Sequence, residues 1–438
     1  MPDQSKAWLD DTTLRVMTYK SGSFTFQLGF DLQQVKPMLD RVNDAQNRFN
    51  KMPSLPQIID QVQEKVLASS IYSTNTIEGG QFTEQETEEI LRLDPKTIQK
   101  TEERRLTNLK EAIDWIKQFS QKRLQPVDGQ SISLTSVINL HRLVSQNLEE
   151  QHNPAGQFRN NQPSQKTVVG NSAHGGTYRP PKCIEDIEYL IQAWVEWLNS
   201  PNVINQPAIV RACLAHYYFE LIHPFWDGNG RTGRLIEMLL LEQSGYRFTS
   251  SAIWAYYQIN IHEYFALFNA CRKAADKKEP LANQAFIEFV LKGMFETINN
   301  LHDQSNGLIS FLLYQTALND AKFSKRISDR QFNLIQTIML VAGQTKKFLT
   351  QAELYRIPQI QVLYTGKTER TFYRDIARLV ELNFLDDQDG LIVQERFSFH
   401  SQTSTSCQHD RYNVHQSILR CVRKTIQAAS FFEQVAQH

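Results

Sequence analysis

The segment 223–234 reads HPFWDGNGRTGR and stands between two apolar stretches, 207–221 and 235–243, whose patterns predict helices. Gly228 and Gly230 let the backbone turn tightly and expose its N–H groups. Where a helix begins, such groups and the helix dipole both favour a bound anion. The segment therefore predicts a helix–loop–helix unit whose loop holds an oligophosphate.

The charged side chains of this segment suit the same ligand. Arg231 and Arg234 are three residues apart, hence on one helical face, and can fork onto phosphate oxygens. Asp227 supplies a carboxylate for Mg²⁺, which also takes phosphate oxygens. Histidine suits proton transfer near neutral pH, and His223 ends the preceding helix. Taken singly, each is more often an ordinary loop or core residue, so the prediction depends on the segment as a whole.

The whole segment matches the signature HPFx(D/E)GNGRxxR at every specified position and on these residues resembles the Fic family. The resemblance implies an all-helical core and an ATP-using enzyme that transfers AMP to Ser, Thr or Tyr hydroxyls of other proteins. It implies His223 as the general base and Asp227 as the Mg²⁺ ligand. It assigns the nucleotide to neighbouring residues, with Gly228, Asn229, Gly230 and Arg231 at the α- and β-phosphates, Arg234 at the γ-phosphate, and Thr232 and Gly233 beside them.

One position separates two branches of this family. In the Doc-type branch the second glycine is a Lys and the enzyme phosphorylates its target. Here that position is Gly230, which favours presenting the α-phosphate to the nucleophile. Such a transfer depends mostly on positioning and charge stabilisation. A different nucleotide donor stays open, because the motif contacts phosphates rather than the base.

A polar stretch ahead of the segment resembles the family's flap, a hairpin that pairs with the backbone of the target. It contains GQFR at 156–159, TVVG at 167–170 and RPP at 179–181. The expected hairpin is centred on 167–169, the target docks on 166–170, and the residues beside the nucleotide are Val168, Val169 and Gly170. A plain surface loop is the alternative, and the longer stretch 171–177 leaves the register open.

A second segment, 262–267, resembles the part of the family near the adenine. Tyr264 and Leu267 lie about one helical turn apart and could form an apolar slot for the base. Packing in a helical core explains the same residues equally well.

Upstream, TNTIEG at 74–79 resembles the family's inhibitory motif, (S/T)xxxE(G/N). It ends a helix expected at about 57–79, as in the subclass with an N-terminal inhibitory helix. The resemblance implies that Thr74, Glu78 and Gly79 form the inhibitor. Glu78 would pair with Arg234 and remove the arginine from the γ-phosphate, which leaves ATP in an unproductive pose.

The C-terminal part has a different character. A helix at about 332–340, a short helix with Thr350 as its N-cap and a helix at 368–382, followed by a hairpin at 384–393, suggest a winged helix-turn-helix. The stretch 366–382 resembles a recognition helix and carries four cations, Lys367, Arg370, Arg374 and Arg378. From Asp320 onward the chain has 16 Lys and Arg against 12 Asp and Glu, which is a weak argument for DNA. Dimerisation or docking of a target protein is the equal alternative.

The whole chain predicts a mainly α protein of 438 residues in three regions. These are an N-terminal helical region at 1–125, a catalytic domain at 126–300 and a winged-helix-like domain at 301–438. The first 20 residues are expected to be poorly ordered, and 22–30 to form a strand or an extended arm. Lys plus Arg equals Asp plus Glu, 47 each, so no global charge favours nucleic acid or an anionic membrane.

The cysteines and the apolar runs indicate where the protein works. The five cysteines are far apart with no CxxC pair, which favours free thiols in a reducing compartment. The N-terminus lacks the apolar core of a signal peptide, and apolar runs such as 239–241 are too short to cross a bilayer. A cytoplasmic protein without a membrane partner is expected.

The leading hypothesis is therefore an ATP- and Mg²⁺-dependent protein adenylyltransferase that Glu78 holds inactive. Two other classes stay open. The same site could run in reverse and hydrolyse AMP from a modified protein, or the chain could be a DNA-binding regulator whose core senses nucleotide. The sequence leaves open a homodimer, the target protein and the modified residue type.

Overall fold

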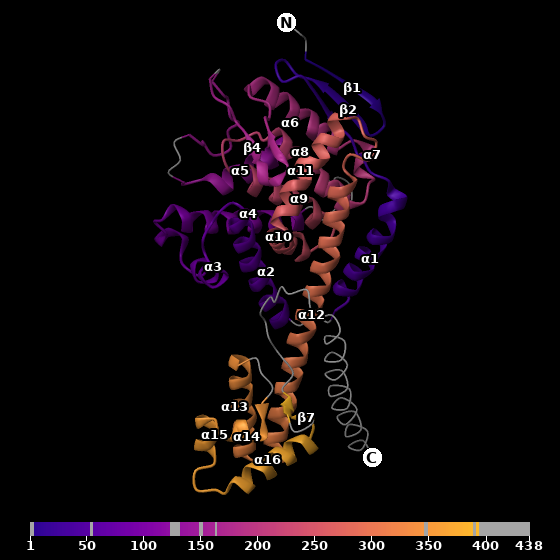
Figure 1. Ribbon diagram of the computed structural model, residues 1–438. Coiled ribbons are helices and arrows are strands. Elements are labelled where there is room, and N and C mark those ends of the chain that lie inside the picture. Colours follow the sequence, from indigo (N-terminus) through magenta and orange to yellow (C-terminus); the bar gives the residue numbers. More distant parts are fainter. Residues whose placement is uncertain are drawn as a thin grey trace. The chain divides into compact units, whose positions relative to one another are not determined.

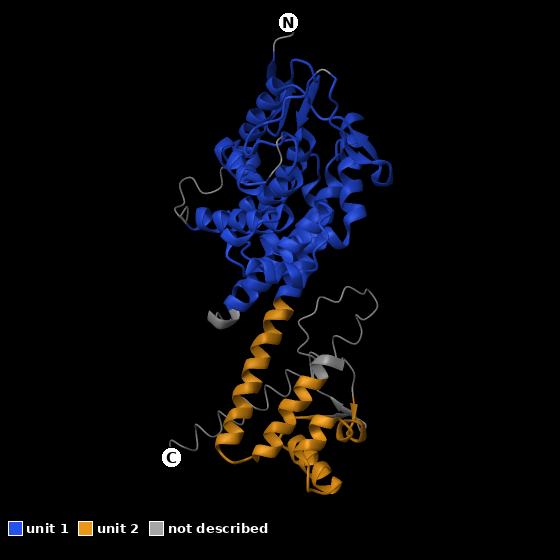
Figure 2. Cartoon of the chain, turned by 90° about the vertical axis from the view of Figure 1, so that its left-hand side faces the viewer, with its two compact units in different colours: residues 1–301 blue, residues 302–438 orange. Residues whose placement is uncertain are grey.

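The computed structural model describes a mainly helical chain, as the sequence predicts. It divides into two compact units, residues 1–301 and 302–438, and the division falls within helix α12, Gln284–Phe323 (Figures 1 and 2). Each unit is described by itself. The described residues are 4–52, 56–122, 132–148, 152–162, 164–345, 349–388 and 391–393.

The N-terminal residues form a sheet, so the expectation of poor order there is wrong. Strands β1, β2 and β3 pair antiparallel in that order, with bounds Ser5–Asp10, Thr13–Met17 and Ser23–Phe26. Leu14 and Val16 alternate along β2 and are fully buried, while Phe26 stacks on Trp197 at a centroid distance of 5.8 Å. The apolar alternation of β2 is short and is flanked by polar residues, which hides it in the sequence.

Helices make up the rest of the first unit. They are α1 Leu32–Asn50, α2 Pro56–Ile77, α3 Glu84–Leu91, α4 Thr101–Lys122, α5 Leu134–Ser145, α6 Ile184–Leu198, α7 Pro201–Ile204, α8 Ala208–Ile222, α9 Asn229–Gln243, α10 Thr249–Ile259 and α11 Ile261–Asp276. The short 3₁₀ turns η1 and η2 cover Pro95–Thr97 and Ser172–His174. The capping box expected at Thr83 and Glu86 is present and starts α3.

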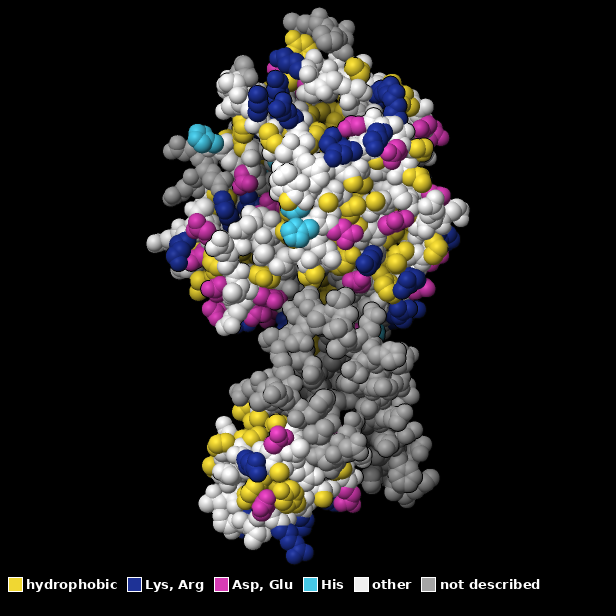
Figure 3. Space-filling view, viewed as in Figure 1, with side chains coloured by type: hydrophobic (Ala, Val, Ile, Leu, Met, Phe, Trp, Pro, Cys, Tyr) yellow, Lys and Arg dark blue, Asp and Glu magenta, His cyan; other side chains and the backbone are white. Residues whose placement is uncertain are grey.

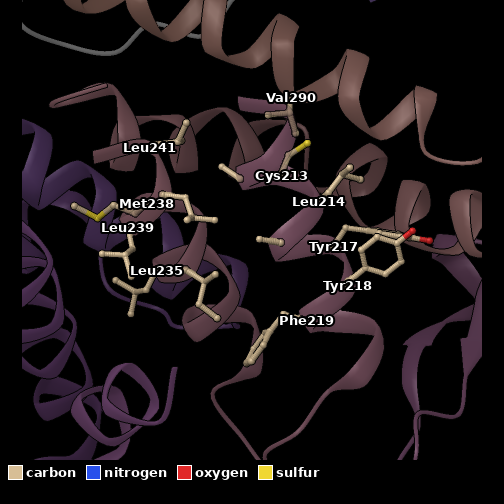
Figure 4. Close-up of a cluster of buried hydrophobic side chains, with 14 of the residues drawn as sticks. Cys213, Leu214, Tyr217, Tyr218, Phe219, Leu235, Met238, Leu239, Leu241 and Val290 are labelled. Atoms are coloured by element: carbon tan, nitrogen blue, oxygen red, sulfur yellow. The ribbon is translucent and has the colours of Figure 1, made fainter. Parts of the chain in front are cut away.

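Helices α8 and α9 form the centre of this unit (Figure 1). Almost every residue of α8 is buried, which is typical of a helix surrounded by others. Figure 4 shows its side chains facing those of α9 and Val290 of α12. A helix pair enclosed in this way gives the loop between them a rigid frame at both ends.

The hairpin that precedes α8 in the chain begins later in the sequence than expected. Strands β4 and β5 cover Val169–Asn171 and Gly176–Tyr178, so 171–177 is the turn and return strand of the hairpin rather than a stretch that follows it. Residues 167 and 168 precede the first strand. The turn ends at Gly175 with a φ of +83°, a conformation that favours glycine and that strand periodicity does not reveal.

The second unit contains further short helices and a small sheet. Its helices are α13 Asp329–Thr345, α14 Gln351–Tyr355, α15 Pro358–Leu363 and α16 Glu369–Glu381, which confirms the helix expected at 368–382. Strands β6, β7 and β8 cover Leu349–Thr350, Asp386–Gln388 and Leu391–Val393 and pair in the order β6-β8-β7. The winged-helix assignment stays a prediction. The stretch at 400–410 and the helix expected after it lie outside the described residues.

The surface of the face seen in Figure 3 mixes Lys and Arg with Asp and Glu, in keeping with the balanced composition. Within the described part of the chain, no helix combines the length and the apolar character that crossing a bilayer requires.

Candidate active site

The loop 223–234 begins at a residue with unusual backbone geometry. His223 ends α8 in the left-handed region, with φ 48° and ψ 60°. Arg159 holds this turn: its Nε donates to the His223 carbonyl at 2.6 Å, and its backbone N–H donates to the Pro224 carbonyl at 2.9 Å. Its guanidinium also donates to the carbonyls of Pro181 and Ile222. Arg159 therefore fixes the direction in which the His223 side chain leaves the helix.

The middle of the loop is braced from inside. The side chain of Asn229 is 2 % exposed, and it accepts from the Phe225 N–H at 2.9 Å and donates to the Phe225 carbonyl at 2.8 Å. Its amide group therefore serves the loop itself rather than a phosphate, and only its backbone N–H can face an anion. Gly228 precedes α9 with a φ of +80°, as expected of the tight turn.

His141 of α5 supports the same loop from below. Its ring stacks on Phe225 with centroids 3.5 Å apart, its Nδ1 accepts from the Gly156 N–H at 3.0 Å, and its Nε2 lies 3.0 Å from the Asp227 carbonyl oxygen. Burial, together with nearby Arg231, lowers the pKa of His141 to about 4. The ring is neutral near pH 7, so Nε2–H donates to Asp227.

Asp227 and Arg231 form an ion pair in which Asp227 is accessible and Arg231 is buried. Their carboxylate and guanidinium are 2.6 Å apart, and the Asp227 side chain is 45 % exposed. Burial alone would raise the pKa of Asp227, but Arg231, the Gly228 N–H and Arg105 of α4 hold it below the ordinary value. The first turn of α9 leaves backbone N–H groups without intrahelical acceptors. A carboxylate, a guanidinium and these N–H groups together suit a phosphate chain.

The expected Mg²⁺ ligand can be tested against its surroundings. Among the described residues, no group of three or more His, Cys, Asp and Glu could form a metal cage. Mg²⁺ in nucleotide sites needs only one or two carboxylates, since phosphate oxygens and waters complete its shell. Asp227 is ionised and accessible, so this single carboxylate fits such an ion.

Arg234 lies deeper and contacts the upstream motif. It is 1 % exposed, and it donates to Thr74 Oγ1 at 2.8 Å and to Glu78 Oε1 at 2.5 Å. Burial would lower the pKa of Arg234, but the Glu78 carboxylate and Tyr264 more than offset this and raise it. Helix α2 packs against α10, which brings residues more than 150 positions apart into one ion pair.

The carboxylate of Glu78 also covers the start of α9. A Cβ atom built on Gly230 would collide with this carboxylate, so a larger residue cannot occupy the position while Glu78 is in place. Gly79 follows with a φ of +86° and ends the helical segment. Glu78 therefore sits where the first turn of α9 would otherwise face a ligand.

A buried polar chain supports Arg234 from behind. Arg234 contacts the Tyr264 hydroxyl at 3.3 Å, and this hydroxyl lies 3.1 Å from His216 Nε2. His216 Nδ1 lies 2.9 Å from Glu237, which also accepts from the Tyr257 hydroxyl at 2.6 Å. His216 and Glu237 were not expected from the sequence. Each is a polar residue whose two neighbours in the sequence are apolar or aromatic, which is the signal that could have identified them.

Tyr264 and Leu267, the two residues expected beside the adenine, differ in how deeply they are buried. The Tyr264 ring is 1 % exposed and packs in the core, as the alternative interpretation expects, while Leu267 is half-buried. Contact of either residue with a base stays a prediction.

The hairpin lies close to the end of α8. The Tyr178 hydroxyl donates to the Leu221 carbonyl at 2.9 Å, and Asn269 of α11 donates to the His174 and Gly176 carbonyls at 3.0 and 2.9 Å. Of the residues expected beside the nucleotide, Val168 is 50 % exposed and Gly170 is exposed, while Val169 is half-buried. Among the described residues, the side-chain hydrogen bonds of Arg234 go to Thr74, Tyr264 and Glu78 and not to this hairpin, so the role of the hairpin toward a nucleotide stays a prediction.

Comparison with known proteins identifies the central part of the chain. A profile of the Fic/DOC family matches residues 131–241. "Protein adenylyltransferase Fic" of Nematostella vectensis is 28 % identical over 212 residues, which are 48 % of this chain and 45 % of that protein. The protein of the same name from Drosophila erecta is 31 % identical over 180 residues, or 40 % of this chain and 32 % of that protein. The chain thus spans less than half the length of these relatives.

Solved structures of similar fold include a Fic family protein from Desulfovibrio desulfuricans, at 17 % identity and a TM-score of 0.48. The similarity covers 84 % of this chain and 97 % of that one. Fic-1 from C. elegans, at 22 % identity and a TM-score of 0.46, covers 62 % and 72 %. The matched residues 131–241 contain the whole loop 223–234, all of α8 and α9 as far as Leu241. This part of the chain is therefore similar to the Fic/DOC family.

Proposed function

We propose that the protein is an adenylyltransferase that moves AMP from ATP to a hydroxyl side chain of another protein. The observation that carries the proposal is that the turn between α8 and α9 places His223, Asp227 and Arg231 around the start of α9, with Arg234 about one turn further along that helix. The relatives named protein adenylyltransferase support it.

The chemistry follows from the places of these residues. The target's hydroxyl oxygen attacks the α-phosphorus of ATP, and its proton moves to Nε2 of His223. The bond between the α-phosphorus and the oxygen that bridges to the β-phosphate breaks, and pyrophosphate leaves. Arg231 and the N–H groups of α9 balance the negative charge that spreads over the phosphate oxygens. Asp227 would hold Mg²⁺, which supplies further charge neutralisation when bound.

We further propose that Glu78 keeps the protein inactive. Its pair with Arg234 and its place over Gly230 both support competition with a phosphate group. The pair is largely buried and also held by Thr74, so it is geometrically specific. An ATP molecule whose γ-phosphate reaches Arg234 would have to displace Glu78.

Transfer of label from ATP to protein tests both parts. In Glu78→Gly, we expect labelling of the protein itself or of lysate targets to rise at least about 10-fold over wild type, since Arg234 is released. Glu78→Gln is the matched variant: it keeps the shape but loses the charge, so its labelling should lie between the two. Equal labelling of all three, with ATP bound, would show that Glu78 does not inhibit.

His223→Ala in the Glu78→Gly background tests the general base. Labelling should fall by at least about 1,000-fold, because no other group then accepts the hydroxyl proton. ATP binding, measured by calorimetry, should stay within about twofold. Labelling that persists at the Glu78→Gly rate would contradict the proposed function.

A reverse reaction is a second candidate, and one observation favours it. Glu78 uses Oε1 for Arg234, while no hydrogen bond among the described residues engages Oε2, which is therefore available to position a water. Incubating purified protein with an AMP-modified target would separate the directions. Release of AMP that depends on Glu78 supports hydrolysis.

The second unit has a surface suited to nucleic acid. Arg370 and Arg374 on α16, and Lys367 just ahead of it, are exposed and have no ion pair within the described residues, while Arg378 pairs with Glu381 at 2.7 Å. Asp375 on the opposite face accepts from Arg330 at 2.7 Å and from Tyr364 at 2.9 Å, which fixes the helix in its unit. We propose that this surface binds DNA.

Binding to duplex DNA at several salt concentrations tests this second proposal. It should weaken with salt and be lost in the double variant Arg370→Glu, Arg374→Glu. Binding that is insensitive to salt and to both charges would leave dimerisation or target docking as the function of α16.

A further inference from the structure

A buried carboxylate lies directly beside the general base. Glu220 precedes His223 by one turn on α8, and its Oε2 is 3.5 Å from His223 Nδ1. The two side chains are 12 % and 18 % exposed. Within the described residues, His223 Nδ1 is buried and has no hydrogen-bond partner of ordinary geometry. Glu220 is thus the acceptor that stands nearest to an otherwise unpaired N–H position.

The motif itself makes room for this carboxylate. A Cβ built on Gly233 would lie 2.8 Å from Glu220 Oε1 and 2.7 Å from His216 Cδ2, both closer than packing allows. Gly233 is therefore the residue on α9 that lets Glu220 occupy its place. Burial of a carboxylate costs solvation free energy that burial of an apolar side chain does not cost. The burial of Glu220 therefore needs a compensating role.

The charges around Glu220 keep it ionised. Burial alone would raise its pKa, but His223, His216 and Arg234 hold the pKa below its ordinary value. His223 and His216 face Glu220 from α8, and Arg234 faces it from α9. At the other side of His223, Arg159 contacts only the backbone carbonyl. Near neutral pH the imidazole of His223 therefore has an anion at Nδ1.

We propose that Glu220 is a positioning residue that sets the tautomer of His223 and stabilises its charged form during transfer. The proposal builds on the transferase activity inferred above. Glu220 accepts the Nδ1–H, which leaves the lone pair of Nε2 free for the hydroxyl proton. No hydrogen bond of the described residues engages Nε2, in agreement with this assignment.

The proton balance of the step explains why an anion is needed there. The target hydroxyl loses its proton as its oxygen bonds to the α-phosphorus, and Nε2 gains that proton. His223 then carries a positive charge with protons on both nitrogens, and Glu220, which stays ionised, balances it. The proton leaves to solvent after pyrophosphate departs. A separation of 3.5 Å can shorten when the ring becomes charged.

Kinetics of Glu220→Gln in the Glu78→Gly background test the proposal. We expect kcat to fall about 100-fold with the KM for ATP within twofold, because the base and not the nucleotide site is changed. The acidic limb of the pH profile should move to lower pH by about 1 unit, since an anion that favours the charged imidazole is gone. Glu220→Asp should recover part of the rate.

Glu242→Gln is the matched control. Glu242 is also a glutamate on the central helix pair and accepts from Ser250 at 2.6 Å, and among the described residues no hydrogen bond or ion pair joins its side chain to the loop. Its kcat and pH profile should match the parent. Thermal unfolding of all variants distinguishes loss of folding from loss of rate, and Glu220→Asp keeps the test valid if Glu220→Gln unfolds.

A readout independent of activity separates this proposal from the transferase assignment. Imidazole ¹⁵N shifts, with His223 assigned by its loss in His223→Asn, should report the Nδ1–H form in wild type and a mixture of tautomers in Glu220→Gln. Unchanged ¹⁵N shifts and an unchanged pH profile would overturn the role of Glu220. If no variant labels protein while the shifts change as expected, the transferase proposal fails and the tautomer assignment stands.

Discussion

The loop 223–234 and the hairpin 169–178 both border the candidate site, but they are held in different ways. The loop is fastened by buried side chains that form hydrogen bonds with its backbone, notably Arg159, Asn229 and His141. The hairpin has exposed residues and is fixed mainly by Asn269 and Tyr178. The difference suggests that the region expected to do chemistry is rigid and the region expected to meet another protein can adapt.

Removing the fastening of the loop should have the largest effect. In Arg159→Ala, several backbone carbonyls lose a buried charged donor, and we expect a loss of about 3 to 5 kcal/mol in unfolding free energy. Label transfer in the Glu78→Gly background should fall by about 100-fold even below the unfolding temperature, since His223 loses its direction.

The control for this variant is Arg142→Ala, which removes an exposed arginine of α5 that bonds Asn139. Denaturant unfolding and label transfer should both stay near the parent. If Arg159→Ala behaves like this control, the loop is rigid for another reason and the comparison with the hairpin fails.

The pH dependence of stability tests the support under the loop. The pKa of His141 is lowered from 6.5 in the unfolded chain to about 4, so the unfolded state binds more protons between these values. Stability is therefore full above about pH 6.5 and is lost as the pH falls, by about 2 kcal/mol between pH 7 and pH 5. Urea unfolding at the two pH values measures this.

In His141→Asn this part of the pH dependence should disappear, although the variant is less stable at pH 7. His152→Asn changes an exposed histidine and should keep the wild-type slope. An equal slope in wild type and His141→Asn would mean that the ring is not held neutral in the folded protein.

Loosening the hairpin should have the smallest effect. Asn269→Ala removes two hydrogen bonds to the hairpin, each worth about 1 kcal/mol, and should raise the KM for a protein target about 3- to 10-fold. Binding of ATP should not change. Asn299→Ala, which removes a bond within α12 only, is the control. A loss of ATP binding in Asn269→Ala would show that the hairpin belongs to the nucleotide site.

The sequence predicts the parts of the site whose residues are neighbours in the chain. It predicts less well the residues that reach the site from distant parts of the chain. The loop, its two helices and the Fic/DOC assignment follow from twelve consecutive residues. The pair of Glu78 and Arg234 was expected because each partner belongs to its own short motif, and the two residues are in contact. In contrast, Arg159, His141 and Glu220 support the loop without belonging to its motif, and only the folded chain brings the first two to it.

Two predictions about strands were wrong, one at the N-terminus and one at the hairpin, and each has a physical cause. The N-terminal sheet was missed because two buried residues in β2 give too short a pattern. The hairpin was placed too early because β-branched residues at 167–169 marked a strand, while glycines with positive φ decide where the chain turns.

Two glycines in the first two turns of α9, Gly230 and Gly233, face the carboxylates of Glu78 and Glu220. Glycine within a helix costs about 1 kcal/mol relative to alanine, so the start of α9 has a deficit of about 2 kcal/mol in intrinsic helix stability. Packing of α9 against its neighbouring helices compensates for this low intrinsic helix stability. Backbone amides of α9 from Thr232 onward, which donate to carbonyls of the chain, should therefore exchange with deuterium only when the core around α8 opens. A fragment containing α9 alone would begin its helix later.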